Sequence, residues 1–313
     1  MIYIHKDIIY GRAQLWHWIK IILDRKRIPN KIIDAHDMDL VKSLDVKDDD
    51  ILLARFGHDK EDLIKTQKVL PTLTDKFKTM FPSKESYYYY DDKLKQYEFM
   101  IENDIPCLET HYVASKEEIE KLNMNFPIVT KKTWGAGSEQ VNYFETLESV
   151  VDDETTRSWT LDSIYPCLVQ EYEDINYDLR ITICGDKVLF YKRMHLWKTR
   201  NKDNFPYGTP QTPRKRVLKY REPPFEKPEE KSCGEDVILD LHDLIVKLHD
   251  LQKTKLNTKY MSWDLVNGKV LEFSVTATMQ HPRYYYDLNT KKKIIPEKWR
   301  HGALTYFLEE YIK

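Results

Sequence analysis

The sequence has little of what the common nucleotide-binding and metal-binding motifs require. Only 9 of its 313 residues are glycine, and neither G-x-G-x-x-G nor G-x-x-x-x-G-K-[ST] occurs, which excludes the usual dinucleotide and P-loop fingerprints. The 4 cysteines form no C-x-x-C pair, which argues against a zinc ribbon and a disulfide framework. These cysteines are Cys107, Cys167, Cys184 and Cys233. A nucleotide or metal site in this chain must therefore be built in another way.

Long apolar runs are absent as well. The longest candidate is broken by Lys20, Asp24 and Arg25, and no run approaches the roughly 18 to 20 residues that a membrane-spanning helix needs. The N-terminal segment, MIYIHKDIIY, lacks the basic head, apolar middle and small-residue cleavage site of a signal peptide. We therefore expect a soluble protein in the reducing cytoplasm.

The charges nearly balance. The 49 basic residues (Lys and Arg) and 51 acidic residues (Asp and Glu) give a net charge of −2, whereas a dedicated nucleic-acid-binding protein needs a strong basic excess. Hydrophobic residues make up 41% of the chain, so a sizeable core can be buried. A chain of this length folds as one large domain or as two to three packed ones.

The N-terminal part of the chain alternates between strand and helix patterns. The apolar run ILLARF is typical of a buried parallel strand, and apolar residues at helical spacing come before and after it. The expected strands are 1–5, 31–35 and 51–56, and the expected helices are 11–26 and 59–81. This order predicts a small α/β domain over residues 1–86.

Two further regions are predicted, over 87–170 and 171–313. Residues 87–90 are a run of tyrosines, which favours an amphipathic loop or an edge strand. The segment 195–233 contains several prolines and glycines, which predict a long loop. The expected strand-rich segments are 126–132, 166–173 and 179–194, with a hairpin at 262–274, and the expected helices are 92–103, 237–251 and 302–312.

The hairpin at 262–274 carries two carboxylates in otherwise apolar strands. Asp264 lies on its first strand, and Glu272 and Ser274 alternate with apolar residues on its second strand. Carboxylates in apolar surroundings are costly unless they are paired or bind a cation. Mg²⁺ prefers a few carboxylates together with phosphate and water. The alternative is a surface hairpin with two unrelated acids.

Whether Asp264 and Glu272 share a face depends on the turn at Asn267-Gly268. A two-residue type I′ turn pairs position 264 with 271, so that the two carboxylates point to opposite faces. A three-residue loop with a left-handed Gly268 pairs position 264 with 270 and places the carboxylates diagonally on one face. A shared metal ion therefore requires the bulged loop or an equivalent irregularity.

Two other strands end in polar groups. The segment 126–132 contains Lys131 and continues into a small-residue turn at Gly135, which can bring backbone N–H groups close to phosphate oxygens. The segment 166–173 ends in the run Gln170-Glu171-Tyr172, whose backbone groups can hydrogen-bond a planar base. Taken alone, the two segments are better explained by a solvated lysine and an ordinary strand-to-loop transition.

The order of these segments is more specific than any one of them. The sequence resembles the ATP-grasp superfamily, nearest its glutathione-synthetase and RimK-type carboxylate–amine ligases. The resemblance covers about residues 88–280. Its segments are DDKLKQYEFMIENDIP (91–106), FPIVTKKTWGAGSEQV (126–141), LVQEYE (168–173), YDLRITICGDKVLFYKRM (177–194) and MSWDLVNGKVLEFS (261–274). It implies an α/β (α+β) chain: an N-terminal α/β domain followed by a two-subdomain ATP-grasp fold, with ATP between its two sheets.

The resemblance also implies roles for individual residues, which fall into four groups. The implied phosphate contacts are Lys93, Lys131 and Gly135; the adenine and ribose contacts are Gln170, Glu171, Tyr172 and Asp178; the groups around the transferring phosphate are Arg193, Arg200 and Asn201; and the Mg²⁺ ligands are Asp264, Glu272 and Ser274. Two Mg²⁺ ions are expected with ATP.

The sequence departs from the family pattern at two places. Ser274 stands where the family usually has an asparagine as a third metal ligand, and a hydroxyl is a weaker ligand for Mg²⁺. The phosphate loop has fewer glycines than usual and carries Glu139 and Gln140 in its distal half. Both departures are typical of a specialised site or of reduced catalysis.

The resemblance implies that ATP phosphorylates a substrate carboxylate and that an amine then attacks the acyl phosphate to form an amide. Two alternatives stay open, an ATP-grasp phosphotransferase and a non-catalytic ATP-binding protein. Candidate acids are an amino acid, a peptide side chain and a sugar uronate. The basic segment 213–221 and the aromatic residues near the C-terminus favour an anionic, glycan-linked partner over any nucleic acid.

Overall fold

The computed structural model describes most of the chain, and every structural statement below concerns those residues. They are 1–7, 18–56, 60–134, 141–150, 163–173, 178–192, 239–276, 285–294 and 302–312. The predicted long loop at 195–233 lies outside them, as do the first residues of the predicted helix at 11–26.

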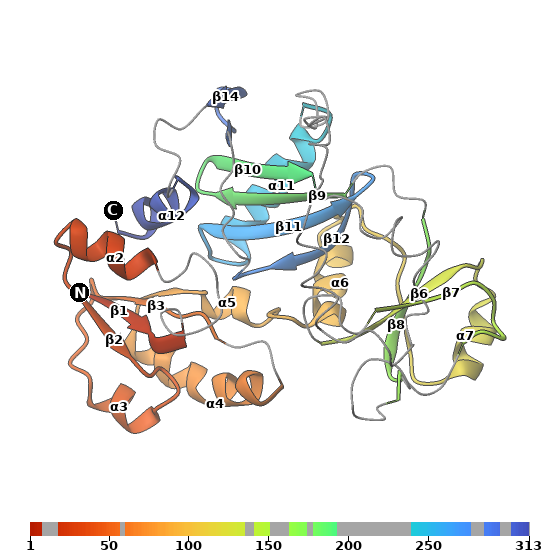
Figure 1. Ribbon diagram of the computed structural model, residues 1–313, viewed down its shortest axis with the longest axis horizontal. Helices are drawn as coiled ribbons and strands as arrows, with labels where there is room; N and C mark the ends of the chain where they lie inside the picture. The colour runs from red at the N-terminus through yellow and green to blue at the C-terminus, as the bar shows by residue number, and fades with distance from the viewer. Residues whose placement is uncertain are drawn as a thin grey trace, which may run out of the picture.

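The N-terminal part forms a parallel four-stranded sheet, as the alternation of strand and helix patterns predicts. The order is β2-β1-β3-β4, and neighbouring strands pair in parallel. In Figure 1 this sheet lies at the left, beside the label that marks the N-terminus. The strands are β1 (Ile2–His5), β2 (Asn30–Ile33), β3 (Ile51–Leu53) and β4 (Thr79–Phe81).

One prediction in this region was wrong. The helix expected over 59–81 ends at Lys76, and residues 79–81 form β4, which pairs with β3. Met80 and Phe81 are buried, so their apolar side chains extend the sheet's core rather than a helical stripe. The other helices of this part are α2 (Trp18–Arg25), α3 (Met38–Ser43), α4 (Lys60–Lys76) and α5 (Lys84–Tyr87).

A second sheet has a hydrophobic core of its own. Its four antiparallel strands lie in the order β5-β8-β6-β7, and α7 (Lys116–Leu122) packs beside it through Ile119. Figure 1 shows this sheet at the side of the molecule far from the N-terminal sheet. The strands are β5 (His111–Val113), β6 (Ile128–Lys132), β7 (Val141–Phe144) and β8 (Cys167–Glu171).

The third sheet carries the predicted hairpin at one edge. Its six antiparallel strands lie in the order β12-β11-β9-β10-β13-β14. The strands are β9 (Asp178–Cys184), β10 (Lys187–Lys192), β11 (Tyr260–Val266), β12 (Lys269–Ser274), β13 (Tyr285–Asp287) and β14 (Lys292–Ile294).

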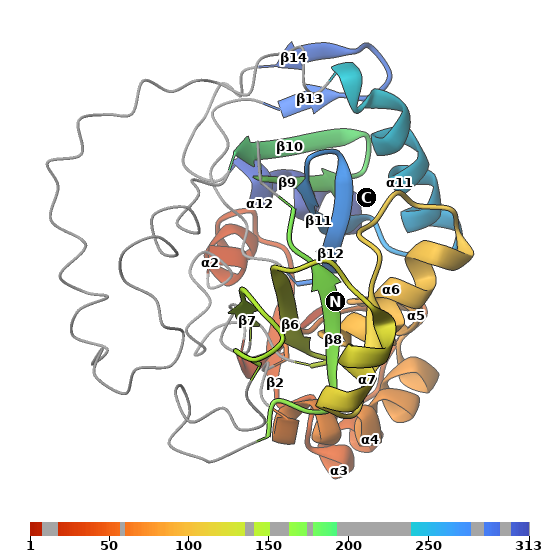
Figure 2. The same cartoon turned by 90° about the vertical axis from the view of Figure 1, so that its right-hand side faces the viewer.

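Two helices cover one face of this third sheet. They are α6 (Lys93–Glu102), which begins at the N-cap Asp92, and α11 (His242–Thr254). Trp263 and Phe273 point to this face and belong to the same buried cluster as apolar residues of both helices. Figure 2 shows α6 and α11 along one side of the sheet. The opposite face of β9, β11 and β12 is therefore the one left for polar residues.

The N-terminal and third sheets share hydrophobic cores. Tyr3 and Leu52 of the first sheet belong to the same buried cluster as Ile181 and Met261 of the third. The C-terminal helix α12 (Gly302–Ile312), which was predicted with these bounds, joins a second shared cluster through Phe307. The N-terminal sheet is thus packed directly against the sheet that carries the candidate metal ligands.

Two exclusions drawn from the sequence can be examined in the described residues. None of their helices combines the length and the apolar character needed to cross a bilayer. Cys107, Cys167 and Cys184 are free thiols.

Candidate functional site

Two of the three predicted metal ligands lie in one row that crosses three strands. Asp264 of β11 lies directly opposite Glu272 of β12 and directly opposite Arg180 of β9. Residues opposite one another on paired strands have Cβ atoms about 4.5–5.5 Å apart and point to the same face. The structure therefore brings both carboxylates together, with an arginine beside them.

A second polar row lies next to the first. Ser262 of β11 lies opposite Thr182 of β9 and Ser274 of β12. The hydroxyls of Thr182 and Ser262 are 2.6 Å apart and hydrogen-bond one another. Because side chains two residues apart on a strand share a face, Ser274 is on the same face as Glu272.

A bulge brings the two carboxylates onto one face. Asn267 and Gly268 both have positive φ (50° and 83°), as a type I′ turn requires, and Val266 pairs with Lys269. Regular pairing from this turn would put Asp264 opposite Leu271. Instead the register shifts between Asp264 and Leu265, so Leu271 is the extra residue and Glu272 takes its place. The predicted alternative of an equivalent irregularity is the one that occurs.

Arg180 makes the strongest contact in the row. Its Nε donates to Oδ1 of Asp264 at 2.6 Å and its terminal nitrogen donates to Oδ2 at 2.7 Å. The Asp264 side chain is only 3% exposed, and a buried carboxylate of this kind needs such a fork-shaped cation. Sequence reasoning missed Arg180, although the alternation of Asp178, Arg180 and Thr182 along β9 could have indicated a polar face.

The donor set fits a magnesium ion. A carboxylate has about four lone-pair positions, and Arg180 donates one hydrogen bond to each oxygen of Asp264. Glu272 is partly exposed and directly opposite, so both side chains can reach one ion. Few carboxylates combined with phosphate oxygens is the ligand set that Mg²⁺ prefers.

The first two of the ordered segments meet at the start of α6. The backbone N–H of Lys93 donates to the C=O of Thr133 at 2.6 Å, and Asp92 forms an isolated bridge with Trp134. Thr133 follows Lys132, the last residue of β6. The predicted phosphate lysine Lys93 thus lies beside the end of the strand that carries Lys131.

The first segment also meets the hairpin. The backbone N–H of Phe273 donates to Oε1 of Gln96 at 3.1 Å, and the N–H of Val270 donates to the C=O of Pro106 at 2.7 Å. The helix α6 and the turn after it therefore hold the strand β12 that carries Glu272.

The predicted adenine hinge lies at the end of β8. Gln170 is buried and donates from Nε2 to the Thr110 hydroxyl at 2.6 Å, while exposed Glu171 accepts from the backbone N–H of Asn125 at 2.8 Å. The N–H of Tyr172 donates to the C=O of Pro127 at 2.9 Å. The pairing of β8 with β5 stops at Val169, so Gln170 and Glu171 pair with a strand only on the side of β6.

An ion pair joins the hinge to the hairpin. Lys269, the first residue of β12, contacts the carboxylate of Glu173, which lies just after Tyr172. Together with the pairing of β6 with β8 and of β9 with β11, this contact links all five ordered segments into one region. Segments far apart in the sequence therefore meet in one connected region that includes Asp264 and Glu272.

A pocket opens near the start of α6. Its volume is about 150 Å³, and its lining includes Asp92, Lys95, Tyr88 and Trp134 together with residues of α4. Lys95 lies over the Tyr88 ring at 4.2 Å and pairs with Asp92 at 3.3 Å. The tyrosine run thus forms a helix and turn that line a pocket, rather than an edge strand.

Of the remaining predicted site residues, only Asp178 belongs to the described part of the chain. Gly135, Arg193, Arg200 and Asn201 lie outside the described residues. Asp178 is the first residue of β9, and its strand position is two residues before Arg180.

Comparisons with known proteins were made for both the sequence and the structure. No family model matches the sequence, and no curated protein matches it. The similar solved structures have the same arrangement of sheets over most of the chain. D-alanine–D-alanine ligase from Bacillus anthracis has a TM-score of 0.53 and 14% identity, covering 99% of this chain and 97% of its own.

Two other structures agree. The RimK-domain ATP-grasp protein from Sphaerobacter thermophilus has a TM-score of 0.51 and 11% identity over 87% of this chain and 90% of its own. Carboxyaminoimidazole ribonucleotide synthase from Aspergillus clavatus, solved with ATP, has a TM-score of 0.52 and 11% identity over 88% of this chain and 69% of its own. The chain has the ATP-grasp fold. At these identities the likeness defines the architecture, and any activity has to be argued from the site itself.

Proposed function

We propose that the protein is an ATP- and Mg²⁺-dependent ligase that joins a carboxylate to an amine. The observation that carries this proposal is the row Arg180–Asp264–Glu272, which lies on two of the five ordered segments. These two segments are linked by contacts to the other three. An ATP-grasp fold supplies the place for the nucleotide, and the row supplies the carboxylates that a magnesium nucleotide needs.

The proposed reaction has two steps. A substrate carboxylate oxygen attacks the γ-phosphorus of ATP, the bond to the bridging oxygen breaks, and ADP leaves with an acyl phosphate remaining. The neutral amine of the second substrate then attacks the acyl carbon, inorganic phosphate leaves, and the amine loses a proton to form the amide. Both steps depend on positioning and charge neutralisation rather than on a covalent bond to the protein.

Each described residue has a distinct part in this proposal. Bound Mg²⁺ would neutralise charge on the phosphates, and Asp264 and Glu272 would hold it. Arg180 fixes the orientation of the Asp264 carboxylate through its two hydrogen bonds. Lys93 and Lys131 would contact phosphate oxygens, since the N-terminus of α6 lies beside the end of β6.

The proposal is tested by coupled release of ADP. Wild-type protein with Mg²⁺ and ATP is screened against pairs of an acid (amino acids, dipeptides, uronic acids) and an amine. Turnover should require both substrates, and Glu272→Gln should lower it by about 100-fold or more, because a metal ligand is lost. Glu98→Gln, an exposed residue on α6 with the same change of charge, serves as the matched control and should keep wild-type turnover.

Other results would contradict the proposal. ADP formed without an amine, together with a stable phosphorylated product, would favour a phosphotransferase. Nucleotide binding without turnover across the whole panel would favour a non-catalytic ATP-binding protein.

A further inference from the structure

The N-terminal sheet has an unassigned polar cluster at the carboxyl ends of its strands. In the order β2-β1-β3-β4 the chain first moves from β1 to one side and then returns to the other, so the order reverses between β1 and β3. Open parallel sheets bind ligands at the carboxyl ends of the strands beside such a reversal. His5 is the last residue of β1, and Asp7 follows it.

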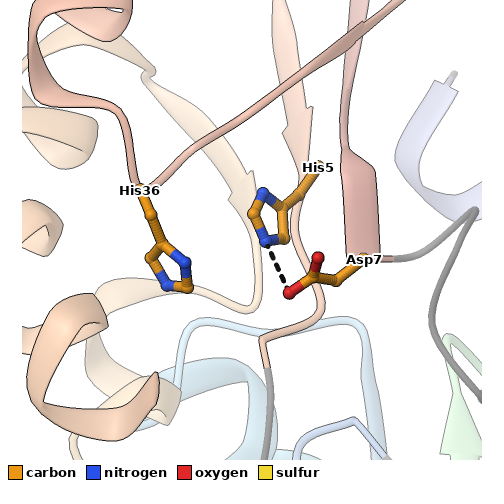
Figure 3. A group of neighbouring side chains, drawn as sticks. All are labelled: His5, Asp7 and His36. Carbon is orange, nitrogen blue, oxygen red and sulfur yellow. Dashed lines mark ion pairs between the residues drawn. The ribbon is translucent and has the colours of Figure 1, made fainter. Parts of the chain in front are cut away.

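Three side chains converge there. His5, Asp7 and His36 each offer one nitrogen or oxygen, and these atoms all lie within 4.8 Å of one another. Figure 3 shows the two rings and the carboxylate turned toward a common point, with an ion-pair line from His5 to Asp7. The Nε2–Oδ2 distance between His5 and Asp7 is 3.2 Å.

The hydrogen bonds of His5 fix where its proton lies. The backbone N–H of Ala35 donates to Nδ1 of His5 at 3.0 Å, so Nδ1 carries a lone pair. In a neutral imidazole the other nitrogen then carries the hydrogen. Nε2 of buried His5 therefore carries the hydrogen, and it lies 3.2 Å from Oδ2 of Asp7 without a recorded hydrogen bond.

In His36, unlike His5, the ring nitrogen that carries the lone pair is available to a ligand. The Thr66 hydroxyl donates its only hydrogen to the C=O of Asp62 at 2.8 Å, so its oxygen accepts from Nε2 of His36, also at 2.8 Å. With the hydrogen on Nε2, the lone pair of His36 lies on Nδ1. No other described residue is recorded as sharing that lone pair. Burial lowers the pKa of His36, which keeps the ring neutral near pH 7.

This arrangement does not suit a three-ligand metal site. A histidine that binds a metal normally donates its other ring N–H to an acceptor. The other nitrogen of His5 faces the Ala35 N–H, which is a donor, so Nε2 cannot give a lone pair to a metal without breaking that contact. The open groups are instead two acceptors, the Asp7 carboxylate and Nδ1 of His36.

Charge points to the same kind of ligand. Lys6 pairs with Asp34, and Lys65 lies 3.9 Å from Asp62, so the neighbouring acids have cations beside them. The closest recorded partner of Asp7 is the neutral ring of His5, and the Asp7 side chain is 35% exposed. Lys6, whose pKa is raised mainly by its hydrogen bond to Asp34, also interacts electrostatically with Asp7. A negative group next to an open nitrogen acceptor is a site for a positively charged hydrogen-bond donor.

The cluster is connected to the metal hairpin. The Phe56 ring lies 5.0 Å from the rings of both His5 and His36. The hydroxyl of Tyr90 donates to the C=O of Phe56 and accepts from the hydroxyl of Thr276, both at 3.1 Å. Thr276 is four residues beyond Glu272 on the same chain segment. The cluster is thus linked, through Phe56 and Tyr90, to the chain segment that carries Glu272.

We propose that Asp7 and His36 bind the ammonium group of the amine substrate. The carboxylate of Asp7 and Nδ1 of His36 each accept one of its hydrogens, and one proton passes from the ammonium group to Nδ1 of His36 so that the neutral amine can attack the acyl carbon. His5, whose Nε2 lies 3.2 Å from Oδ2 of Asp7, is a positioning residue. This proposal rests on the proposed ligase function for the identity of the ligand, and on the cluster alone for its chemistry.

A binding experiment tests the chemistry without turnover. Protein labelled with ¹⁵N at histidine is titrated with ethylammonium, putrescine and lysine, and with ethanol as a neutral comparison. At least one ammonium probe should shift the ring signals of His36 in a saturable way, while ethanol should not, and His111 on the distant β5 serves as an internal control. Asp7→Asn should abolish the saturable shift.

A turnover experiment tests the role in the reaction. With an acid that the protein activates, hydroxylamine traps the acyl phosphate as a hydroxamate and needs no ammonium site. Asp7→Asn and His36→Gln should raise the KM of the amine by about tenfold to a hundredfold, the size of a lost charge-assisted hydrogen bond. Hydroxamate formation should stay within about twofold of wild type, which shows that the variants are folded.

The results separate this proposal from the proposed function. If no acid gives hydroxamate in wild type, the ligase proposal fails, and a saturable His36 shift would still support an ammonium site. If all ammonium probes leave His36 as unmoved as His111, or if both variants keep the wild-type amine KM, the ammonium site is overturned. Micromolar binding of Zn²⁺ that depends on Asp7 and His36 would overturn it in favour of a metal site.

Discussion

Two regions of the molecule combine a carboxylate with a nitrogen base, and they do so in opposite ways. On the third sheet, Asp264 is buried and is held by the permanent cation of Arg180. At the carboxyl ends of the strands of the N-terminal sheet, Asp7 is partly exposed and faces His5. The buried ring of His5 stays neutral because burial lowers its pKa. The first carboxylate is neutralised and rigid, whereas the second keeps its charge for a ligand.

The largest expected effect comes from removing the cation of the first region. Arg180→Met should lower the free energy of unfolding by about 3–5 kcal/mol, because Asp264 is left buried without its partner. Urea unfolding followed by circular dichroism measures the change. Arg25→Met, at the exposed end of α2, is the control and should change little.

A double variant distinguishes an orphaned charge from lost packing. Arg180→Met combined with Asp264→Leu should recover most of the lost stability, since no buried charge then remains. If the double variant is as unstable as the single one, packing rather than charge explains the loss.

The next effect concerns the turn that sets the register of the row. Gly268 has φ 83°, so Gly268→Ala should cost about 1–2 kcal/mol of unfolding free energy. Asn267→Gly is the matched change in the same turn and should be nearly neutral, because glycine accepts the positive φ of 50°. Equal losses in both variants would mean that the turn is not the type I′ turn described above.

A smaller effect is expected from the protonation of His5 in the second region. The pKa of His5 is lowered, mainly by burial and with His36 adding to it, whereas Asp7 and Asp34 act in the opposite direction. Below about pH 6.5 the unfolded chain therefore binds a proton that folded His5 resists, and stability falls as the pH falls. His5→Asn, whose side-chain oxygen can still accept from Ala35, should lose up to about 1 kcal/mol less than wild type between pH 7.5 and 5.5.

Thermal unfolding at several pH values measures this difference. His111→Asn, a partly exposed position on β5, is the comparison and should follow the wild-type profile. A His5→Asn profile as steep as wild type would show that folding does not lower the pKa of His5.

The smallest expected effect comes from removing the charge of Asp7, the carboxylate of the second region. Asp7→Asn should change the free energy of unfolding by less than about 1 kcal/mol, since its contact is a partly exposed one to a neutral ring. A loss as large as that of Arg180→Met would contradict the assignment of Asp7 to ligand binding and make it a structural residue.

The sequence predicted what depends on local pattern. The turn at Asn267-Gly268, the helix expected over 92–103 and the bounds of α12 follow from turn chemistry and helical periodicity, and all three occur. The bulge at Leu271 could be named only as a requirement, because its position depends on how Trp263 and Phe273 pack into the shared core.

Features set by distant parts of the chain were missed. The strand β4 is only three residues long and is defined by its pairing with β3, so it was read as the end of a helix. Arg180 lies 84 positions from Asp264, and only the register of β9 with β11 brings them together. The polar edge at Asp7 and His36 likewise exists only once β1 and β2 are paired.

Calorimetric titration of a non-hydrolysable ATP analogue tests the central claim most directly. With Mg²⁺ the wild-type protein and Glu98→Gln should bind the analogue with equal affinity, and Glu272→Gln should lose the Mg²⁺-dependent part of that affinity, about 100-fold. Binding by Glu272→Gln that is unchanged with Mg²⁺, or no binding by wild type at millimolar nucleotide, would contradict the assignment of the row Arg180–Asp264–Glu272 to a magnesium-nucleotide site.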